Sequence, residues 1–274
     1  MVNRKWSHWL PNIKKEINET SGIVGLLGVG TGVAGLVIAI PIVVGVGSAL
    51  LASALGYCVY KGFPERMYKP SELLGQTSPP SILKSLSEHI PAIGIIGASK
   101  AGKSTFISHL ITTPNPTERT QSVYATIFAL QTSPVKYSAL LDGDGTQYNQ
   151  QFKVIDNSSI LFVFFDHNAS ETLNEIDPER IIDHDRFLEQ LEGYLKELSN
   201  QSSIKLDCIH FVLNKSDSWK ENNEEDEQKI ISWYENILVN WRRLPYSKNI
   251  SGSIHSNKNA EDIKSLLNVI TGYV

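Results

Sequence analysis

The sequence predicts an α/β fold: a mixed, mostly parallel six-stranded sheet flanked by helices and preceded by an N-terminal apolar helical hairpin. Two observations lead to this expectation. From about residue 91 to residue 274, short apolar runs alternate with segments of helical spacing, which is typical of a sheet with helices on both faces. Ahead of this region, residues 22–60 contain no charged side chain. We therefore expect a short amphipathic leader (1–21), a membrane hairpin (22–60), a Pro-containing linker (61–90) and an α/β domain (91–274).

The elements of the α/β domain follow from its hydrophobic pattern. Short apolar runs predict strands at residues 92–96, 123–130, 137–141, 160–166, 206–213 and 250–254. Apolar residues at helical spacing predict helices at residues 105–111, 186–198, 230–241 and 260–273. A short helix is also expected after Pro80, with Ile82, Leu83 and Leu86 facing the domain.

Composition excludes several classes of protein. Residues 91–274 carry 17 Lys and Arg against 24 Asp and Glu, so this part lacks the excess of basic residues that is typical of nucleic-acid-binding domains. The two cysteines lie far apart in the sequence and form neither a disulfide framework nor a zinc motif. The sequence therefore indicates a protein of a reducing compartment with no nucleic-acid partner.

The uncharged segment 22–60 is nearly twice as long as the roughly 20 residues of one membrane span, so two spans turning near Pro41 fit it better. Lys and Arg occur on both flanks and not inside, which places both flanks, and the α/β domain, on the cytoplasmic side. Gly28-x-x-x-Gly32 and Ala52-x-x-x-Gly56 favour close helix packing, within one hairpin or between copies. A re-entrant or in-plane hairpin is the alternative. Residues 11–20 suit either a membrane surface or a solvated helix.

Residues 97–104 fit the phosphate-loop pattern G-x-x-x-x-G-K-[ST] and lie between an expected strand and an expected helix. Such a loop directs backbone N–H groups and the positive end of a helix dipole at one point. Lys103 is expected to reach the β- and γ-phosphates, and the Ser104 hydroxyl is expected to ligate Mg²⁺. The expected phosphate-binding residues are Gly97, Ala98, Ser99, Lys100, Ala101, Gly102, Lys103, Ser104 and Thr105.

A second motif, Asn214-Lys215-Ser216-Asp217, follows an apolar strand. With both motifs in this order, residues 91–274 resemble the Ras-like, translation-factor-related (TRAFAC) class of P-loop GTPases. The resemblance implies that GTP or GDP and Mg²⁺ are bound, and that Asp217 accepts hydrogen bonds from guanine. Lys215 would lie along the base, and Asn214 would tie this loop to the phosphate loop.

The resemblance extends to the other three motifs of the class. Asp142-Gly143-Asp144-Gly145 matches D-x-x-G, which implies that Asp142 holds Mg²⁺ through water and that the Gly145 N–H senses the γ-phosphate. Thr120 would be the single Thr that ligates Mg²⁺ and takes part in catalysis, with Thr117 and Thr126 as alternatives. The fifth motif is matched best by Ser253-Ile254-His255, with a backbone N–H near Ile254 contacting guanine O6.

Two departures from the pattern bear on hydrolysis. Thr146 occupies the position where Ras-like enzymes carry a Gln that orients the attacking water, and Asp144 adds a carboxylate near the expected γ-phosphate. Both favour slow turnover. Lys100, inside the phosphate loop, either offsets charge on the phosphates during hydrolysis or is a solvated side chain.

These features together predict a membrane-anchored GTP-binding protein that hydrolyses GTP slowly and acts as a switch. Its expected partners are GTP, the lipid bilayer and a second copy of itself, through the Gly-rich helices or the GTP-binding domain. One alternative is a membrane effector or pore-type protein whose hairpin is gated by the GTP-binding domain. Another is a nucleotide-binding scaffold without turnover.

Overall fold

The computed structural model describes residues 66–111, 122–170, 173–201, 206–220, 224–246 and 248–273. The expected leader, the hairpin at 22–60 and Thr120 lie outside these ranges. Residues Lys69–Val274 form one compact unit. Among the helices that are described, none combines the length and the apolar character that a membrane crossing requires.

The unit is built on a seven-stranded sheet with the order β1-β3-β4-β2-β5-β6-β7. Neighbouring strands from β4 to β7 pair in parallel, whereas β3 pairs antiparallel with both β4 and β1. The strands are β1 (Thr77–Ser78), β2 (Ala92–Gly97), β3 (Tyr124–Leu130), β4 (Lys136–Asp142), β5 (Ile160–Phe165), β6 (Cys208–Leu213) and β7 (Asn249–Ile254). The expected sheet was mixed and mostly parallel, and the structure has that pairing.

The expected number of six strands is wrong by one. The additional strand, β1, comes from the expected linker and pairs with β3, where the Thr77 and Thr126 hydroxyl oxygens lie 3.3 Å apart. A strand of two residues is too short to show an alternating pattern, so the sequence did not reveal it. The linker also contains two 3₁₀ helices, η2 (Pro70–Leu73) and η3 (Pro80–Ser85). The second of these confirms the short helix expected after Pro80.

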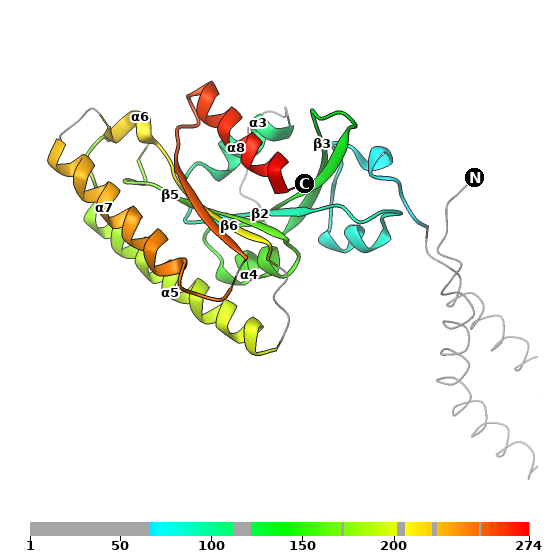
Figure 1. The fold of residues 1–274 in the computed structure, drawn as a ribbon, viewed down its shortest axis with the longest axis horizontal. Helices are drawn as coiled ribbons and strands as arrows, with labels where there is room; N and C mark the ends of the chain where they lie inside the picture. Colours follow the sequence, from blue (N-terminus) through cyan, green and yellow to red (C-terminus); the bar gives the residue numbers. More distant parts are fainter. Residues whose placement is uncertain are drawn as a thin grey trace, which may run out of the picture. The chain divides into compact units, whose positions relative to one another are not determined.

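Helices cover both faces of the sheet, with α3 and α8 on one side and α4, α5 and α7 on the other (Figure 1). The helices are α3 (Lys103–Ile111), α4 (Tyr148–Asp156), α5 (Pro178–Asn200), α6 (Ser216–Trp219), α7 (Glu224–Trp241) and α8 (Ala260–Tyr273). Every residue of β2, β5 and β6 is buried, as expected for strands covered on both faces. Phe106 of α3 packs between these strands and α8, with its ring centroid 5.4 Å from that of Phe164.

The sequence did not predict α4, and its composition explains why. Two of its four buried residues are glutamines, Gln150 and Gln151, so the apolar period of the helix is interrupted. Helix α5 starts earlier than expected, at Pro178, where the Asp177 carboxylate caps it by accepting from the Glu179 N–H at 3.0 Å.

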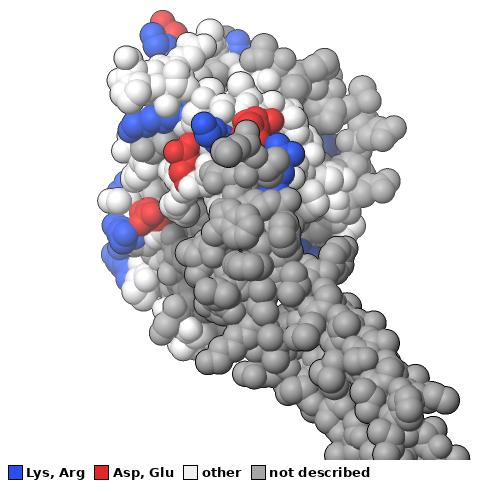
Figure 2. All heavy atoms as spheres, turned by 90° about the vertical axis from the view of Figure 1, so that its right-hand side faces the viewer, with Lys and Arg blue, Asp and Glu red and all other residues white. Residues whose placement is uncertain are grey.

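Charged side chains of both signs lie close to one another on the face shown in Figure 2, where acidic and basic residues neighbour each other among the described residues. The described residues on this face therefore present mixed charge.

Candidate functional site

Four loops meet at one edge of the sheet. Because β2, β4, β5 and β6 are mutually parallel neighbours, the segments that follow them leave the sheet at the same edge. These segments are the phosphate loop after β2, Asp142–Gly145 at the end of β4, Asp166 after β5 and Asn214–Asp217 after β6. The motif residues predicted from the sequence are thus brought together by the parallel order of the strands.

The phosphate loop has the backbone that its glycines predict. Gly97 and Gly102 have φ values of 134° and 89°, where residues with a Cβ atom are strained. A Cβ atom on Gly97 would collide with the Phe164 carbonyl oxygen of the neighbouring strand. Lys100 is exposed and also adopts a left-handed conformation, with φ 66°. Helix α3 begins at Lys103, so the loop opens directly onto a helix N-terminus.

Lys103 is a buried cation at the centre of the site, with an exposed fraction of 7%. Its Nζ atom donates to the carbonyl oxygens of Gly97 and Ala98 at 2.9 and 2.8 Å. Burial lowers the pKa of Lys103 to about 8, an effect that the nearby Asp142 carboxylate only partly offsets. A bound phosphate would supply the negative charge that stabilises the ammonium form, so the site fits a polyphosphate.

Gly145 of the D-x-x-G segment lies directly against the phosphate loop. A Cβ atom there would lie 2.5 Å from Lys103 Nζ and 3.0 Å from the Gly97 carbonyl oxygen, so a side chain at this position would displace the Lys103 ammonium. Gln151 of α4 joins the same two segments: its Oε1 accepts from the Gly97 N–H at 2.9 Å and its Nε2 donates to the Gly145 carbonyl at 3.1 Å. Sequence reasoning missed Gln151, because a buried glutamine has the sequence signature of a surface residue.

Asp144 has a structural role in the turn that follows. Its Oδ1 accepts from both the N–H and the hydroxyl of Thr146, each at 2.8 Å. The carboxylate therefore stabilises the turn into α4, and Thr146 is exposed with its hydroxyl directed at Asp144.

The loop after β6 is tied to the phosphate loop as expected. Asn214, which is 1% exposed, donates from Nδ2 to the Ala101 carbonyl at 2.8 Å, so the predicted link between the two loops is confirmed. Lys215 adopts a left-handed conformation with φ 61°. Its Nζ donates to the Asn168 carbonyl at 2.7 Å and pairs with the Asp166 carboxylate at 2.7 Å.

Asp217, the expected base-reading residue, accepts from the Ser256 hydroxyl at 2.6 Å and from Lys258 Nζ at 2.7 Å. Partial burial raises the pKa of Asp217, but the hydrogen bonds from Lys258 and Ser256 outweigh it and hold the pKa below its usual value. The group is therefore a carboxylate at neutral pH, able to accept two N–H groups of a purine.

The expected fifth motif, Ser253-Ile254-His255, lies at the end of β7, and its contact with guanine stays a prediction. Ser253 and Ile254 are still part of β7, and the Ser253 hydroxyl lies 3.0 Å from His210 Nε2. The residues that meet the other loops come after the strand end: Ser256 and Lys258 contact Asp217, and Asn257 Nδ2 donates to the Gly102 carbonyl at 2.8 Å. The tripeptide Ser256-Asn257-Lys258 just before the closing helix was the available signal.

The proposed metal ligands have the expected chemistry. The Ser104 side chain is exposed in the first turn of α3, and the Asp142 carboxylate lies at the end of β4, accepting from the Gly143 N–H at 2.9 Å. No group of three His, Cys, Asp or Glu residues that could bind a metal occurs within the described ranges. Mg²⁺ is typically held by one or two protein oxygens together with substrate phosphates, so this donor set fits it.

Thr120 lies outside the described residues, and its role stays a prediction. Thr126, one of the alternatives, is a buried residue of β3 that pairs with the Thr77 hydroxyl, so it is not the predicted loop residue.

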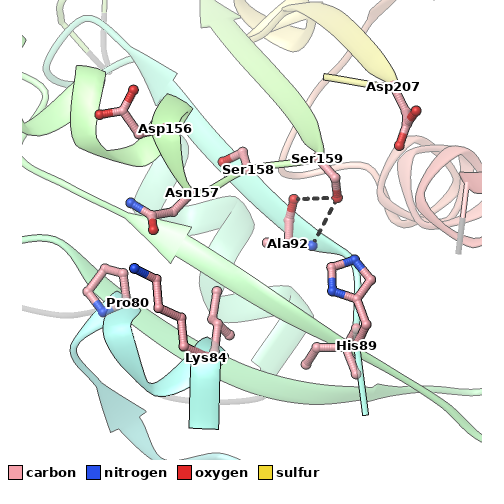
Figure 3. Close-up of a pocket in the computed structure, with 11 residues that line it drawn as sticks. Pro80, Lys84, His89, Ala92, Asp156, Asn157, Ser158, Ser159 and Asp207 are labelled. Carbon is pink, nitrogen blue, oxygen red and sulfur yellow. Dashed lines mark hydrogen bonds between the residues drawn. The ribbon is translucent and has the colours of Figure 1, made fainter. Parts of the chain in front are cut away.

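A separate cavity of about 360 Å³ lies at the opposite edge of the sheet. It is formed by η3, the residues that lead into β2, β5 and β6, and the end of α4 (Figure 3). Ser159 is one of the residues that line it, and its hydroxyl accepts from the Ala92 N–H at 3.1 Å. None of the predicted site residues lines this cavity.

No protein-family model matches the chain, and no curated protein matches it. Solved structures do. Translation elongation factor SelB from Methanococcus maripaludis, in complex with the GTP analogue GppNHp, is 18% identical with a TM-score of 0.43, over 67% of this chain and 33% of that one. The mammalian SRP receptor is 15% identical with a TM-score of 0.46, over 67% of this chain and 100% of that one. Roco2 RocCORdC from Methanosarcina barkeri, bound to GDP, is 14% identical with a TM-score of 0.40, over 73% of this chain and 51% of that one.

The chain thus spans 33% of the SelB structure, and all three TM-scores are below 0.5, so these similarities do not define the site. The candidate site is defined by its own loops. A phosphate loop, a D-x-x-G segment and an N-K-x-D segment, on parallel strands, converge at one sheet edge and are joined there by hydrogen bonds. The described residues therefore form an α/β domain in which the predicted motif loops lie at one edge of the sheet, as the sequence motifs predict.

Proposed function

We propose that this protein is a membrane-anchored GTP-binding protein that hydrolyses GTP slowly and acts as a molecular switch. The observation that supports this most is the link between the two nucleotide loops. Asn214 and Asn257 each donate to a carbonyl of the phosphate loop, and both lie beside residues that contact Asp217 or belong to its motif. Asp217, which would read the base, is thereby held close to the loop that would bind the phosphates.

Guanine selection follows from the acceptor character of Asp217. A carboxylate accepts from the N1–H and the 2-amino group of guanine together, whereas adenine offers no such pair of donors. An adenine nucleotide would present no such donor pair to the carboxylate, which discriminates against it.

Phosphate binding would use Lys103, Ser104 and Asp142. The Lys103 ammonium, which bonds the Gly97 and Ala98 carbonyls, is the cation for the β- and γ-phosphates. The Ser104 hydroxyl would hold Mg²⁺ directly and Asp142 would hold it through water. When bound, the ion neutralises charge on the phosphates.

The switch would lie in the segments that meet the γ-phosphate. Gly145 packs on the phosphate loop and is linked to it through Gln151, so a γ-phosphate contact at the Gly145 N–H would be transmitted into α4. The loop that carries Thr120 would be the second such segment. Turnover would be slow because Thr146, which bonds Asp144, stands where a water-orienting Gln is expected.

The membrane anchor is proposed from the uncharged segment 22–60 and the Lys and Arg residues on both of its flanks, which favour a cytoplasmic GTP-binding domain. Its Gly-x-x-x-Gly spacing favours close packing of helices, within the hairpin or between copies. No described residue favours the alternative of a gated pore.

The decisive experiment compares binding and turnover of GTP, ATP and XTP by the purified protein and its Asp217→Asn variant. We expect the protein to prefer GTP. In the variant, GTP affinity should fall roughly 10- to 100-fold while XTP affinity rises, since xanthine offers an oxygen where guanine has its amino group. Asp183→Asn, at an exposed acid of α5, is the matched control and should change neither the GTP affinity nor the XTP affinity. A preference for ATP, or no nucleotide binding, would refute the proposal.

A further inference from the structure

A buried carboxylate that belongs to none of the nucleotide motifs lies between the two nucleotide loops. Asp166 follows β5 directly and is fully buried. Its Oδ1 accepts from Arg180 Nε at 2.6 Å and lies 3.0 Å from His184 Nε2, while its Oδ2 pairs with Lys215 Nζ at 2.7 Å. The carboxylate thus holds one cation from α5 and one from the loop that carries Asp217.

Arg180 extends from Asp166 to the phosphate loop. It lies in the first turn of α5, is 8% exposed, and donates from Nη2 to the Ser99 carbonyl at 2.7 Å. The planar guanidinium can contact Asp166 with one nitrogen and Ser99 with another because its donors form a rigid fork. Arg180 therefore links the Ser99 peptide to the carboxylate that follows β5.

Lys215 extends from the same carboxylate to the base-reading loop. It precedes Asp217 by two residues, and its left-handed backbone conformation directs the chain into α6. The Lys215 ammonium also donates to the Asn168 carbonyl at 2.7 Å. The orientation of the segment that carries Asp217 is thus tied to Asp166.

Electrostatics make the three groups interdependent. Burial raises the pKa of Asp166, yet hydrogen bonds from His184 and Arg180 hold the pKa at about 2, so the group is ionised at neutral pH. An ionised buried carboxylate that loses one cation depends more strongly on the other, and the neighbouring groups rearrange. The charge of Arg180 also contributes to lowering the pKa of Lys103, after the larger effect of burial.

We propose that Arg180, Asp166 and Lys215 form a positioning network that couples recognition of the guanine base to binding of the phosphates of the same nucleotide. The inference rests on the proposed function, since it concerns the same nucleotide site. Arg180 is here a positioning residue: in the described residues it meets the phosphate loop at Ser99 and the base-reading loop through Asp166.

The test measures the affinities of the full-length protein for GTP and for ITP, whose base lacks the 2-amino group, by competition with a fluorescent GDP analogue. Arg180→Met should weaken GTP binding by roughly 5- to 150-fold, the usual range of coupling between sites, and should also reduce the GTP-to-ITP preference. Arg180→Lys can still pair with Asp166 but cannot reach Ser99. This variant should bind both GTP and ITP more weakly and keep the preference for GTP over ITP. Arg186→Met, at an exposed Arg of the same helix, is the control and should change neither value.

If Arg180 acts only on the phosphate loop, Arg180→Met should lower the affinities for GTP and ITP by the same factor, and that result would overturn the proposal. Unchanged affinities would overturn it as well. Circular dichroism and thermal unfolding establish that each variant is folded, and Arg180→Gln replaces Arg180→Met if that variant does not fold. If the unmodified protein shows no preference for guanine nucleotides, the proposed function fails first. If it shows the preference and Arg180→Met keeps it, the network alone is refuted.

Discussion

Gly102 shows how closely the two nucleotide loops approach each other. Its φ of 89° lies in the region that disfavours side chains, and a Cβ atom there would collide with Asn214 Nδ2 and lie 2.7 Å from Asn257 Nδ2. These are the two amides that donate to the phosphate loop, at Ala101 and Gly102. The glycine is therefore required both by its backbone and by its neighbours.

Gly102→Ala should lower the free energy of unfolding by about 2–4 kcal/mol, because it combines backbone strain with displacement of two hydrogen-bonded amides. GTP binding should be lost even where the variant folds. Urea unfolding and nucleotide titration measure the two effects. Gly193→Ala is the control: nothing lies within 4 Å of its added Cβ, and in the middle of α5 it should stabilise the protein by about 1 kcal/mol. Equal effects of the two substitutions would contradict this account of Gly102.

At the scale of elements, β6 and β7 are joined by a buried histidine as well as by their backbone pairing. His210 of β6 is 2% exposed, and its Nδ1 and Nε2 lie 2.8 and 3.0 Å from the hydroxyl oxygens of Ser251 and Ser253 on β7. Burial, with a smaller contribution from nearby His255, lowers the pKa of His210 to about 4. The imidazole is therefore neutral in the folded protein at neutral pH.

This burial predicts a loss of stability in mild acid. Between pH 6.5 and 4 the unfolded chain carries the His210 proton and the folded chain does not, so the free energy of unfolding falls as the pH falls. From pH 7 to pH 5 the contribution is about 2 kcal/mol. Urea unfolding at both pH values should show a smaller loss in His210→Gln, whereas His89→Gln, at an exposed histidine, should behave as the unmodified protein. An identical pH dependence in all three would rule out this role of His210.

The elements that the sequence predicted well are those whose pattern is local. β2, β5 and β6 are continuous apolar runs, and each was expected at nearly its observed residues. Helix α4 was missed because two of its buried residues, Gln150 and Gln151, are polar. Gln150 accepts from the Asp144 N–H and Gln151 accepts from the Gly97 N–H, so both bond the backbone of the site loops. Local polarity does not reveal that a glutamine has a partner distant in the sequence.

At the scale of the whole molecule, the compact unit Lys69–Val274 contains the complete set of described nucleotide loops, whereas the uncharged segment 22–60 precedes it. Because these two regions are separate along the chain, nucleotide binding and membrane attachment should be separable functions.

The full-length protein should float with phospholipid vesicles in a density gradient, and deletion of residues 22–60 should abolish flotation while GTP affinity changes less than about threefold, or roughly 0.7 kcal/mol. Washing at high salt and alkaline pH is the control, since adsorption through Lys and Arg is screened by salt whereas an inserted hairpin is retained. Flotation that persists after the deletion would contradict the proposed anchor.

The sequence by itself determined that this chain carries a phosphate loop and an N-K-x-D segment, because each is a contiguous pattern whose chemistry depends on neighbouring residues. Only the tertiary structure decided that Ser256 and Lys258 contact Asp217 and that Asn257 contacts the phosphate loop, since their register depends on where β7 ends. It also decided that Asp166 and Arg180 join the loop that carries Asp217 to the phosphate loop. Ser99 and Arg180 lie far apart in the sequence, and a contact between them exists only because adjacent parallel strands bring their carboxyl ends to one edge.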